Sequence, residues 1–338
     1  MRIALDAMGG DHAPTPIVIG AVQAVAADPE LTVVLVGDLA QIEPILAQQS
    51  GPMERLEIFH CSQVVGMQES PVDALRKKPD NSISRSWQLL AERKVDGIVS
   101  AGHTGAMVAG GMRLKRYLPK VRRPGIATIM PTIKGPCVIL DVGANITPKP
   151  LHLLQYAVMG SQFAKHLLQK EVPTIGLMNV GEEAGKGNEL AKVTHDLFLA
   201  SPLKDRFIGN IEGRDIHRGV CDVVITDGFV GNVMLKVCEG IFEFLMKMFS
   251  NEVLGSLNVE RPQAQLAMKN LIDRYDYSSF GGAPLLGIDG VCIICHGSSR
   301  ERAIKNAISV ASQHVRSGVN QRITEELDSL PSLGSDDE

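Results

Sequence analysis

The feature of this sequence that most constrains its fold is a regular alternation of short apolar, β-branched runs with longer amphipathic segments. The short runs predict strands at residues 2–5, 32–36, 56–59, 97–100, 126–130, 137–142, 174–180, 207–211, 220–226 and 291–296. Helical patterns separate most of them, at 16–27, 82–94, 107–116, 151–169 and 188–200. This alternation predicts a three-layer α/β/α fold, in which a mainly parallel sheet is covered on both faces.

The net charge and the first residues of the chain exclude some classes of protein. A net charge of -4 over 338 residues argues against a nucleic-acid-binding protein, because a binding face for nucleic acid usually makes the balance basic. Residues 1–3 lead directly into the first predicted strand, without the charged start and apolar core of a secretory signal. We therefore expect a cytoplasmic globular protein.

Six cysteines are scattered through apolar runs, which favours buried, reduced thiols over a disulfide framework. The stretch Cys292-Ile-Ile-Cys295-His296 has the form of a haem-attachment or metal-binding motif. It lies in a predicted strand, where residues i and i+3 point to opposite faces, and no second cysteine pair accompanies it. We predict that both thiols pack in the core and that the chain holds no metal.

Glycine and polar residues collect where six of the predicted strands end. Ligands of α/β proteins bind at the carboxyl ends of the strands, so we expect these loops to converge on one cleft with fixed N–H donors. The candidate phosphate- or substrate-binding residues are Asp6, Gly9, Gly10, Asp11, His12, Gly102, His103, Thr104, Gly105, Asp141, Asn145, Asn179, Glu183, Asp227, Gly228, Gly231, His296, Gly297, Ser298 and Ser299. Turns also favour these residue types, so one such loop alone is weak evidence.

The loop at 227–232 has the clearest geometry for an anion. It joins an apolar strand to a helix predicted from Val233, which brings backbone N–H groups and a helix N-terminus to one point. The alternative is an ordinary turn in which Asn232 is the N-cap of the helix. The residues leave both interpretations open.

Several chemistries lack their sequence motifs. No Gly-x-Gly-x-x-Gly or Walker sequence follows a strand, and neither a Gly-x-Ser-x-Gly elbow nor a His-x-x-x-His spacing is present. We therefore expect no cofactor, no metal centre and no covalent triad. A small anion held by backbone donors and a lysine fits these residues better.

The strand ends carry Asp-Ala-Met-Gly-Gly-Asp-His, Ala-Gly-x-Thr-Gly-Ala, Asp-Val-Gly-Ala-Asn, Asn-x-Gly-x-Glu-x-x-Lys-Gly, Thr-Asp-Gly-Phe-x-Gly-Asn and His-Gly-Ser-Ser. In order and spacing, from Met1 to about Ile323, these motifs resemble those of the bacterial phosphate acyltransferases of phospholipid synthesis. The resemblance implies transfer of a long-chain fatty acyl group from acyl-carrier protein to inorganic phosphate, giving acyl phosphate for a membrane glycerol-3-phosphate acyltransferase. It also implies a homodimer and a fold similar to those of phosphotransacetylase and isocitrate dehydrogenase.

The resemblance points to Lys186 and Asn232 as the catalytic pair, with bound phosphate attacking the thioester directly. His103 departs from the family's Ala-Gly-Asn-Thr-Gly-Ala pattern, which leaves the role of that position open. Two other functions stay open: a coenzyme-A-dependent phosphotransacylase, and an inactive membrane scaffold that binds carrier protein.

Several loop residues have a structural alternative. Asp11 and Asp141 either order their loops or contact substrate. His12, which we expect to be buried beside Ala13-Pro14, is either a structural histidine or a proton donor. Ser298 and Ser299 are expected to cap the last long helix and bind phosphate at once.

A basic stretch predicts a docking surface for acyl-carrier protein or an anionic membrane. It comprises Arg113, Lys115, Arg116, Lys120, Arg122 and Arg123, with no acidic residue between them. The alternative is a solvated helix end.

The last expectations concern domain organisation. Residues 1–326 are predicted to form one catalytic domain, and residues 327–338, rich in Ser, Pro, Asp and Glu, a disordered acidic tail. Within the domain, residues 233–276 are predicted to form a helical hairpin that carries more apolar surface than one core-facing stripe requires. We expect this hairpin to make a dimer contact or a peripheral membrane contact.

Overall fold

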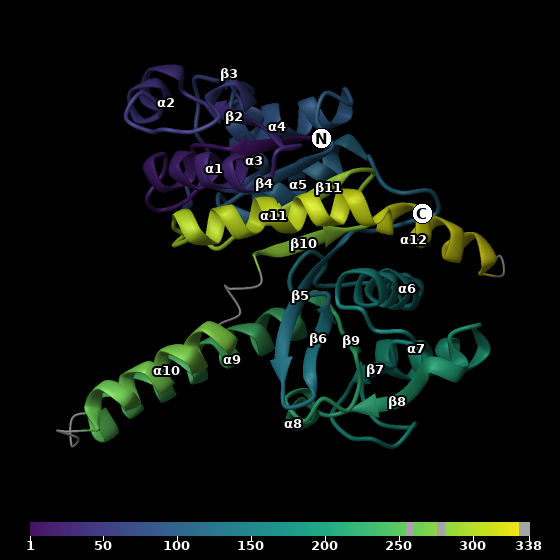
Figure 1. Ribbon diagram of the computed structural model, residues 1–338. Helices are drawn as coiled ribbons and strands as arrows, with labels where there is room; N and C mark the ends of the chain where they lie inside the picture. The colour runs from purple at the N-terminus through teal and green to yellow at the C-terminus, as the bar shows by residue number, and fades with distance from the viewer. Residues whose placement is uncertain (255–259, 276–280, 331–338) are drawn as a thin grey trace.

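The structure is a computed structural model that describes residues 1–254, 260–275 and 281–330. Within these residues eleven strands form one sheet, in the order β3-β2-β1-β4-β11-β10-β5-β6-β9-β7-β8 (Figure 1). The strands are β1 (Arg2–Asp6), β2 (Thr32–Gly37), β3 (Leu56–His60), β4 (Gly97–Ser100), β5 (Gly125–Thr132), β6 (Gly135–Leu140), β7 (Ile175–Met178), β8 (Phe207–Ile211), β9 (Val223–Ile225), β10 (Ala283–Leu286) and β11 (Val291–Ile294). Most neighbours are parallel, which confirms the predicted mainly parallel sheet.

The sheet consists of two parallel blocks that run in opposite directions. β1, β2, β3, β4 and β11 form one block, and β6, β7, β8 and β9 form the other. Between them β10 is antiparallel to both β11 and β5, and β5 is antiparallel to β6. In this register Ala283 pairs with Ile294, Leu285 with Ile126, and Ala127 with Leu140. The carboxyl ends of the two blocks therefore point to opposite edges of the sheet, and β10 and β5 connect the blocks.

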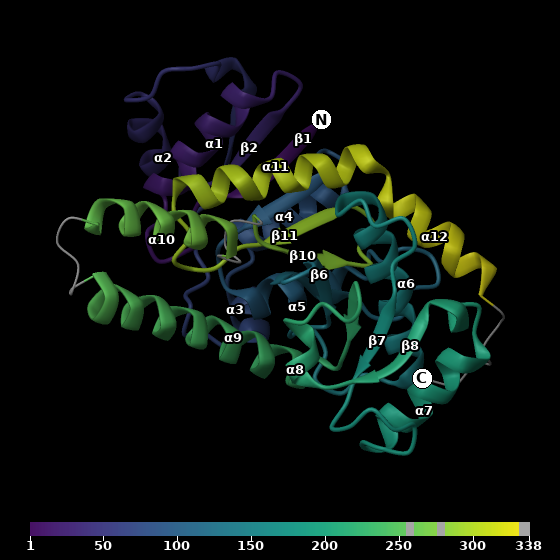
Figure 2. The same ribbon diagram turned by 60° about the horizontal axis from the view of Figure 1, so that its bottom comes forward.

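Helices cover both faces of the sheet (Figures 1 and 2). The helices are α1 (Thr15–Ala27), α2 (Leu39–Leu46), α3 (Pro71–Lys77), α4 (Ser82–Ala91), α5 (Thr104–Leu114), α6 (Pro150–Leu167), α7 (Glu189–Ala200), α8 (Gly213–Ile216), α9 (Gly228–Met248), α10 (Arg261–Tyr275), α11 (Glu301–Ser317) and α12 (Val319–Ser329). Helices α1 and α11 pack on one face of the first block and α4 and α5 on the other, while α6, α7 and α12 cover the second block. The three-layer prediction is confirmed.

The two thiols of the Cys-x-x-Cys stretch lie on opposite faces of β11. Cys292 packs into the core beneath α4 and α5, and Cys295 packs into the core beneath α1 and α11. Burial raises the pKa of the Cys295 thiol to about 12, so the thiol stays protonated and packs as a small apolar group. Their prediction as core residues is confirmed.

Several predicted bounds differ from the structure by a few residues, and three differences matter for the site or the tail. Helix α9 begins at Gly228, five residues before the predicted start, because Asp227 caps it. β10 was not predicted, since its four residues include a proline and are too few to show a period. The acidic tail does not begin at Leu327, because that residue is buried in α12; residues 331–338 lie outside the described ones.

Helices α9 and α10 lie side by side and protrude from the body as the predicted hairpin (Figure 2). A π-helical segment at Phe249–Leu254 follows α9, and residues 255–259 lie outside the described ones. In the described part of the chain no helix is both long enough and apolar enough to cross a bilayer.

We predict that Gly231→Ala lowers the free energy of unfolding by about 1–3 kcal/mol, because a Cβ there would lie 1.9 Å from the carbonyl oxygen of Asp141. The matched control is Gly240→Ala in the same helix, where a Cβ meets open space and should stabilise the helix by roughly 0.5–1 kcal/mol. Urea denaturation of both variants measures the difference. Equal stability of the two would show that the close approach of α9 to the loop after β6 is not needed.

Candidate functional site

The buried carboxylate of Asp6 holds together the loops that follow β1 and β4. Only 1% of Asp6 is exposed; it accepts hydrogen bonds from the Ser100 hydroxyl at 2.7 Å and from the Met8 N–H at 3.2 Å. Ser100 Oγ in turn accepts the N–H of Gly102. Burial raises the pKa of Asp6, and these hydrogen bonds oppose the rise. A Cβ at Gly9 would lie 2.4 Å from this carboxylate, so the site requires glycine there.

A third loop joins this pair. The N–H of Asp11 donates to the carbonyl of Gly297 at 2.8 Å, which fixes the loop after β11 to the loop after β1. Gly10 has a φ of +110° and lies against Gly297 and Ala101, so a larger residue would be strained there. Three of the six predicted loops therefore meet at the carboxyl ends of the first block.

A second buried carboxylate, Asp141, organises the loop that follows β6. It is fully buried and accepts hydrogen bonds from the N–H groups of Ile126, Gly143, Ala144 and Asn145 at 2.7–3.0 Å. Burial raises its pKa, and the four backbone donors oppose the rise. Its oxygens are thus occupied within the loop, so of the two roles left open for Asp141 the structure favours the ordering one.

The side chain of Asn145 is also occupied. Its amide nitrogen donates to the carbonyl of Pro124 and to the hydroxyl of Tyr156, both at 2.6 Å, and the backbone carbonyl of Asn145 accepts the N–H of Gly228. Asn145 therefore joins the start of α9 to the start of β5. It supports the site, because both N–H donors of its amide are used within the protein.

The start of α9 is not the anion site that the sequence suggested. Asp227 caps the N–H groups of Phe229 and Val230, both at 2.9 Å, and the N–H groups of Gly228 and Gly231 bond to carbonyls. The backbone donors of this helix N-terminus are therefore already used. The prediction of Asn232 as N-cap is also wrong, because Asn232 lies in the second turn and its side chain is free to face a ligand.

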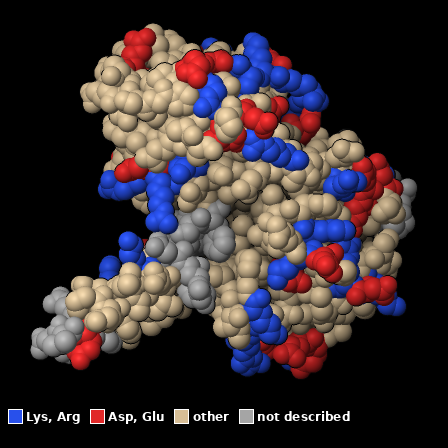
Figure 3. All heavy atoms as spheres, in the orientation of Figure 1, with Lys and Arg blue, Asp and Glu red and all other residues tan. Residues whose placement is uncertain are grey.

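The loops and α9 enclose a cavity of about 350 Å³, the strand-end hollow. Its lining includes seven predicted site residues, namely Asp11, Gly102, Thr104, Asn232, His296, Gly297 and Ser299. Figure 3 shows the molecule hollowed between the upper half and the protruding hairpin, with Lys and Arg side chains at the rim. A volume of this size is within the usual range for small-molecule sites, about 300–1,000 Å³.

The remaining predicted binding and catalytic residues do not line the strand-end hollow. Asn179, Glu183 and Lys186 lie in the loop after β7, where Asn179 donates to the carbonyl of Lys186 at 3.1 Å and the Lys186 side chain is exposed. His12 is exposed rather than buried, so its expected burial is wrong. The catalytic role predicted for Lys186 stays a prediction.

Helix α5 begins at the hollow, which Thr104 lines, with backbone donors that no protein group accepts in the described residues. His103 is its N-cap: Nδ1 accepts the Ala106 N–H at 3.4 Å, and Nε2 donates to the Glu69 carbonyl at 3.1 Å. In the described residues the N–H groups of Thr104 and Gly105 have no protein acceptor. Two unpaired N–H groups at a helix N-terminus are a ready anion site.

The loop after β11 leads into α11. Ser298 contacts the His296 ring at 2.8 Å, and the described residues provide no side-chain cap for α11 at Arg300. The prediction that Ser298 and Ser299 cap this helix is therefore wrong. The first turn of α11 contributes Ala303 to the lining of the strand-end hollow.

Lys236 and Thr128 are among the lining residues that the sequence analysis missed. Lys236 lies one turn after Asn232 on the same face of α9, and Thr128 lies on β5. The Lys236 ammonium pairs with Glu239 at 2.7 Å. With the helix predicted to begin at Gly228, Asn232 and Lys236 would stand at positions i and i+4 on one face, and Lys236 would have been a candidate.

Acidic residues from other parts of the chain neutralise two of the cations of the basic stretch. Arg116 pairs with Asp289 at 3.3 Å, and Lys120 pairs with Asp328 at 2.9 Å. Arg113, Lys115, Arg122 and Arg123 are exposed and remain the candidates for docking.

Comparisons with known proteins agree with this geometry. Residues 1–322 match the model of a family described as fatty acid synthesis protein. The chain is 44% identical to a phosphate acyltransferase of Geobacter sulfurreducens over 97% of its length and 94% of the relative, and 47% identical to one of Heliobacterium modesticaldum over 97% and 98%. A phosphotransacetylase from Streptococcus pyogenes has the same fold, with a TM-score of 0.61, 17% identity and 94% of each chain covered.

For the N-cap at position 103 we predict that His103→Ala lowers the free energy of unfolding by about 1 kcal/mol, because the Ala106 N–H loses its acceptor. His103→Asn should keep the wild-type value within about 0.5 kcal/mol, since the amide oxygen of Asn is a strong cap. Urea denaturation measures both. An alanine variant as stable as the wild type would mean that His103 does not cap α5.

Proposed function

The chain belongs to the phosphate acyltransferase family of fatty acid synthesis proteins, and on that premise we propose that it transfers a long-chain acyl group from acyl-carrier protein to inorganic phosphate. The observation that carries the proposal is the strand-end hollow, which combines the unpaired N–H groups of α5 with the side chains of Asn232 and Lys236. These groups are donors, so they suit an anionic reactant.

Charge decides where phosphate lies in this hollow. The carboxylate of Asp11 lines one wall and would repel a phosphate placed beside it. We therefore place phosphate between the first turn of α5, at Thr104 and Gly105, and the Asn232 and Lys236 side chains of α9. The ammonium of Lys236 has three N–H donors, so it bonds to phosphate while it keeps its pairing with Glu239.

The reaction follows from this placement. Phosphate is largely ionised near pH 7, so one of its oxygens attacks the thioester carbonyl carbon without a protein base. The carbon–oxygen bond forms, the carbon–sulfur bond of the tetrahedral intermediate breaks, and the carrier thiolate leaves and takes a proton from solvent. The products are acyl phosphate and free carrier thiol. The protein supplies alignment of the two reactants and hydrogen bonds for the oxyanion.

The decisive experiment incubates the purified chain with long-chain acyl-carrier protein, with and without phosphate. We expect free carrier thiol and acyl phosphate only when phosphate is present. Thiol release from acyl-coenzyme A alone would support the coenzyme-A-dependent alternative. Binding of carrier protein without turnover would support the inactive scaffold.

We predict that Asn232→Ala lowers kcat about 100-fold while the fold stays intact, because removal of one donor to the developing charge has about that effect. Lys236→Ala should raise the KM for phosphate. Lys192→Ala, an exposed lysine of α7, is the matched control and should change neither value. Wild-type kcat in Asn232→Ala would place the chemistry elsewhere.

The resemblance assigns catalysis to Lys186 as well, so a loss of kcat in Lys186→Ala would mean that the loop after β7 reaches the strand-end hollow during turnover.

For the carrier protein we predict that charge reversal at Arg113, Arg122 and Arg123 raises its KM and leaves the KM for phosphate unchanged, because an acidic partner is attracted by exposed cations. Steady-state kinetics at low ionic strength measures both constants, with Lys192→Glu as the control. An unchanged KM for carrier protein would exclude docking on this surface.

The second partner that we propose is another copy of the chain. Val237, Ile241 and Phe244 form one face of α9, and each is more than half exposed. An apolar face of this kind is stable in water when a second copy covers it. Sedimentation at dilute and high concentration tests the homodimer. A monomer at every concentration that floats with anionic vesicles would instead favour the membrane contact.

A further inference from the structure

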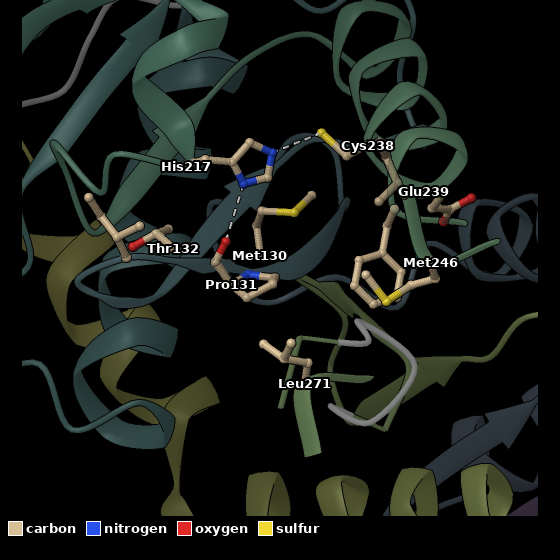
Figure 4. A pocket seen from close by; sticks show the side chains of 11 residues that line it. Met130, Pro131, Thr132, His217, Cys238, Glu239, Met246 and Leu271 are labelled. Carbon is tan, nitrogen blue, oxygen red and sulfur yellow. Dashed lines mark hydrogen bonds between the residues drawn. The ribbon is translucent and has the colours of Figure 1, made fainter. Parts of the chain in front are cut away.

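A second cavity, the apolar hollow, lies between α9, α10 and the β5–β6 hairpin. Its volume is about 270 Å³ (Figure 4). The wall consists almost entirely of apolar side chains and contains Met130, Pro131, Thr132, Ile133, His217, Leu235, Cys238, Glu239, Phe242, Met246 and Leu271. A cavity with this lining suits a hydrocarbon group.

The two hollows lie end to end along the same strand and the same helix. On β5, Ile126, Thr128 and Ile129 line the strand-end hollow, and the next residues, from Met130, line the apolar hollow. On α9, Asn232 lines the first hollow and Met246 the second, while Leu235 and Glu239 line both. A ligand whose polar head lies at Asn232 would therefore pass Leu235, which lines both hollows, to place its tail in the apolar hollow.

Each polar side chain in the wall of the apolar hollow has a partner in the protein. The His217 ring lies 3.4 Å from the Cys238 sulfur and 3.4 Å from the carbonyl oxygen of Pro131 (Figure 4). The Thr132 hydroxyl donates to the carbonyl of Gly135, and Glu239 pairs with Lys236. An apolar occupant therefore leaves no polar group of the wall without a partner.

The Cys238 thiol does not compete with phosphate for the acyl group. Burial raises the pKa of this thiol, which keeps it protonated and a poor nucleophile. A covalent acyl-cysteine intermediate is therefore disfavoured, and the residue acts as part of the wall.

The path has the length of a membrane fatty acid. From Asn232 to Met246 α9 spans about 21 Å at a rise of 1.5 Å per residue. The acyl chains of one bilayer leaflet span about 15 Å, half of the hydrocarbon core. The difference leaves room for the phosphate and the thioester at the Asn232 end.

We propose that the apolar hollow binds the hydrocarbon tail of the acyl donor and that Cys238 and Phe242 limit its length. The proposal rests on the proposed function, since it assigns the tail of a donor whose thioester lies in the strand-end hollow. Leu235, Cys238, Phe242 and Met246 recur every three or four residues, so they form the inner face of α9. The exposed face with Val237 and Ile241 is a different one.

The test measures kcat/KM for butyryl, dodecanoyl and octadecanoyl carrier protein in the wild type and three variants. Cys238→Phe fills the hollow, and each methylene that it excludes should reduce the apparent affinity about fourfold. We expect at least a tenfold lower kcat/KM for the octadecanoyl donor and little change for the butyryl donor. Phe242→Ala enlarges the hollow and should shift the preference towards the longest donor. Lys247→Phe, an exposed position on the same helix, is the control and should leave the preference unchanged.

The outcomes separate the two proposals. If the wild type releases no thiol in a phosphate-dependent way from any donor, the proposed function is wrong. If the wild type is active but Cys238→Phe and Phe242→Ala affect all chain lengths equally, or not at all, the tail does not lie in the apolar hollow. Opposite shifts of chain-length preference in these two variants support the inference, and they do so even if one variant is less stable than the wild type.

Discussion

The arrangement depends on two carboxylates that are kept out of water. Asp6 ends β1 and Asp141 follows β6, so each stands where one block of the sheet ends. A buried carboxylate is costly unless donors surround it, and here Ser100 and the backbone N–H groups of the flanking loops provide them. The loops can satisfy these oxygens in one conformation only, which fixes the backbone around the strand-end hollow before any substrate binds.

Much of the architecture is visible in the sequence because it depends on local pattern. Apolar runs that alternate with helices predict the layers, and glycine with polar residues at strand ends predicts the loops that bring Asp11, Thr104 and His296 into one hollow. These features are set by residues close together in the chain. The opposed directions of the two blocks are not, because they depend on how β10 pairs with β5, which lies far away in sequence.

The errors have physical causes as well. Asp227 and Asn232 are both good N-caps, and propensity cannot choose between them. The choice is made by a tertiary contact, since Gly228 and Gly231 lie against the loop of Asp141 and only a helix that begins at Gly228 permits that approach. Because the helix was predicted to begin at Val233, Lys236 was not recognised as a residue of the site. The exposed position of Lys186 has no counterpart in the sequence pattern at all.

Strand β10, which forms the seam between the two blocks, has a consequence for catalysis. Four residues of β10 join the first block to the second, two through β11 and two through β5. The α5 donors belong to one side of that seam and the α9 side chains to the other. A shift of β10 would leave the geometry within each set of groups unchanged but would move the two sets relative to each other. The alignment that the reaction requires therefore depends on these four residues.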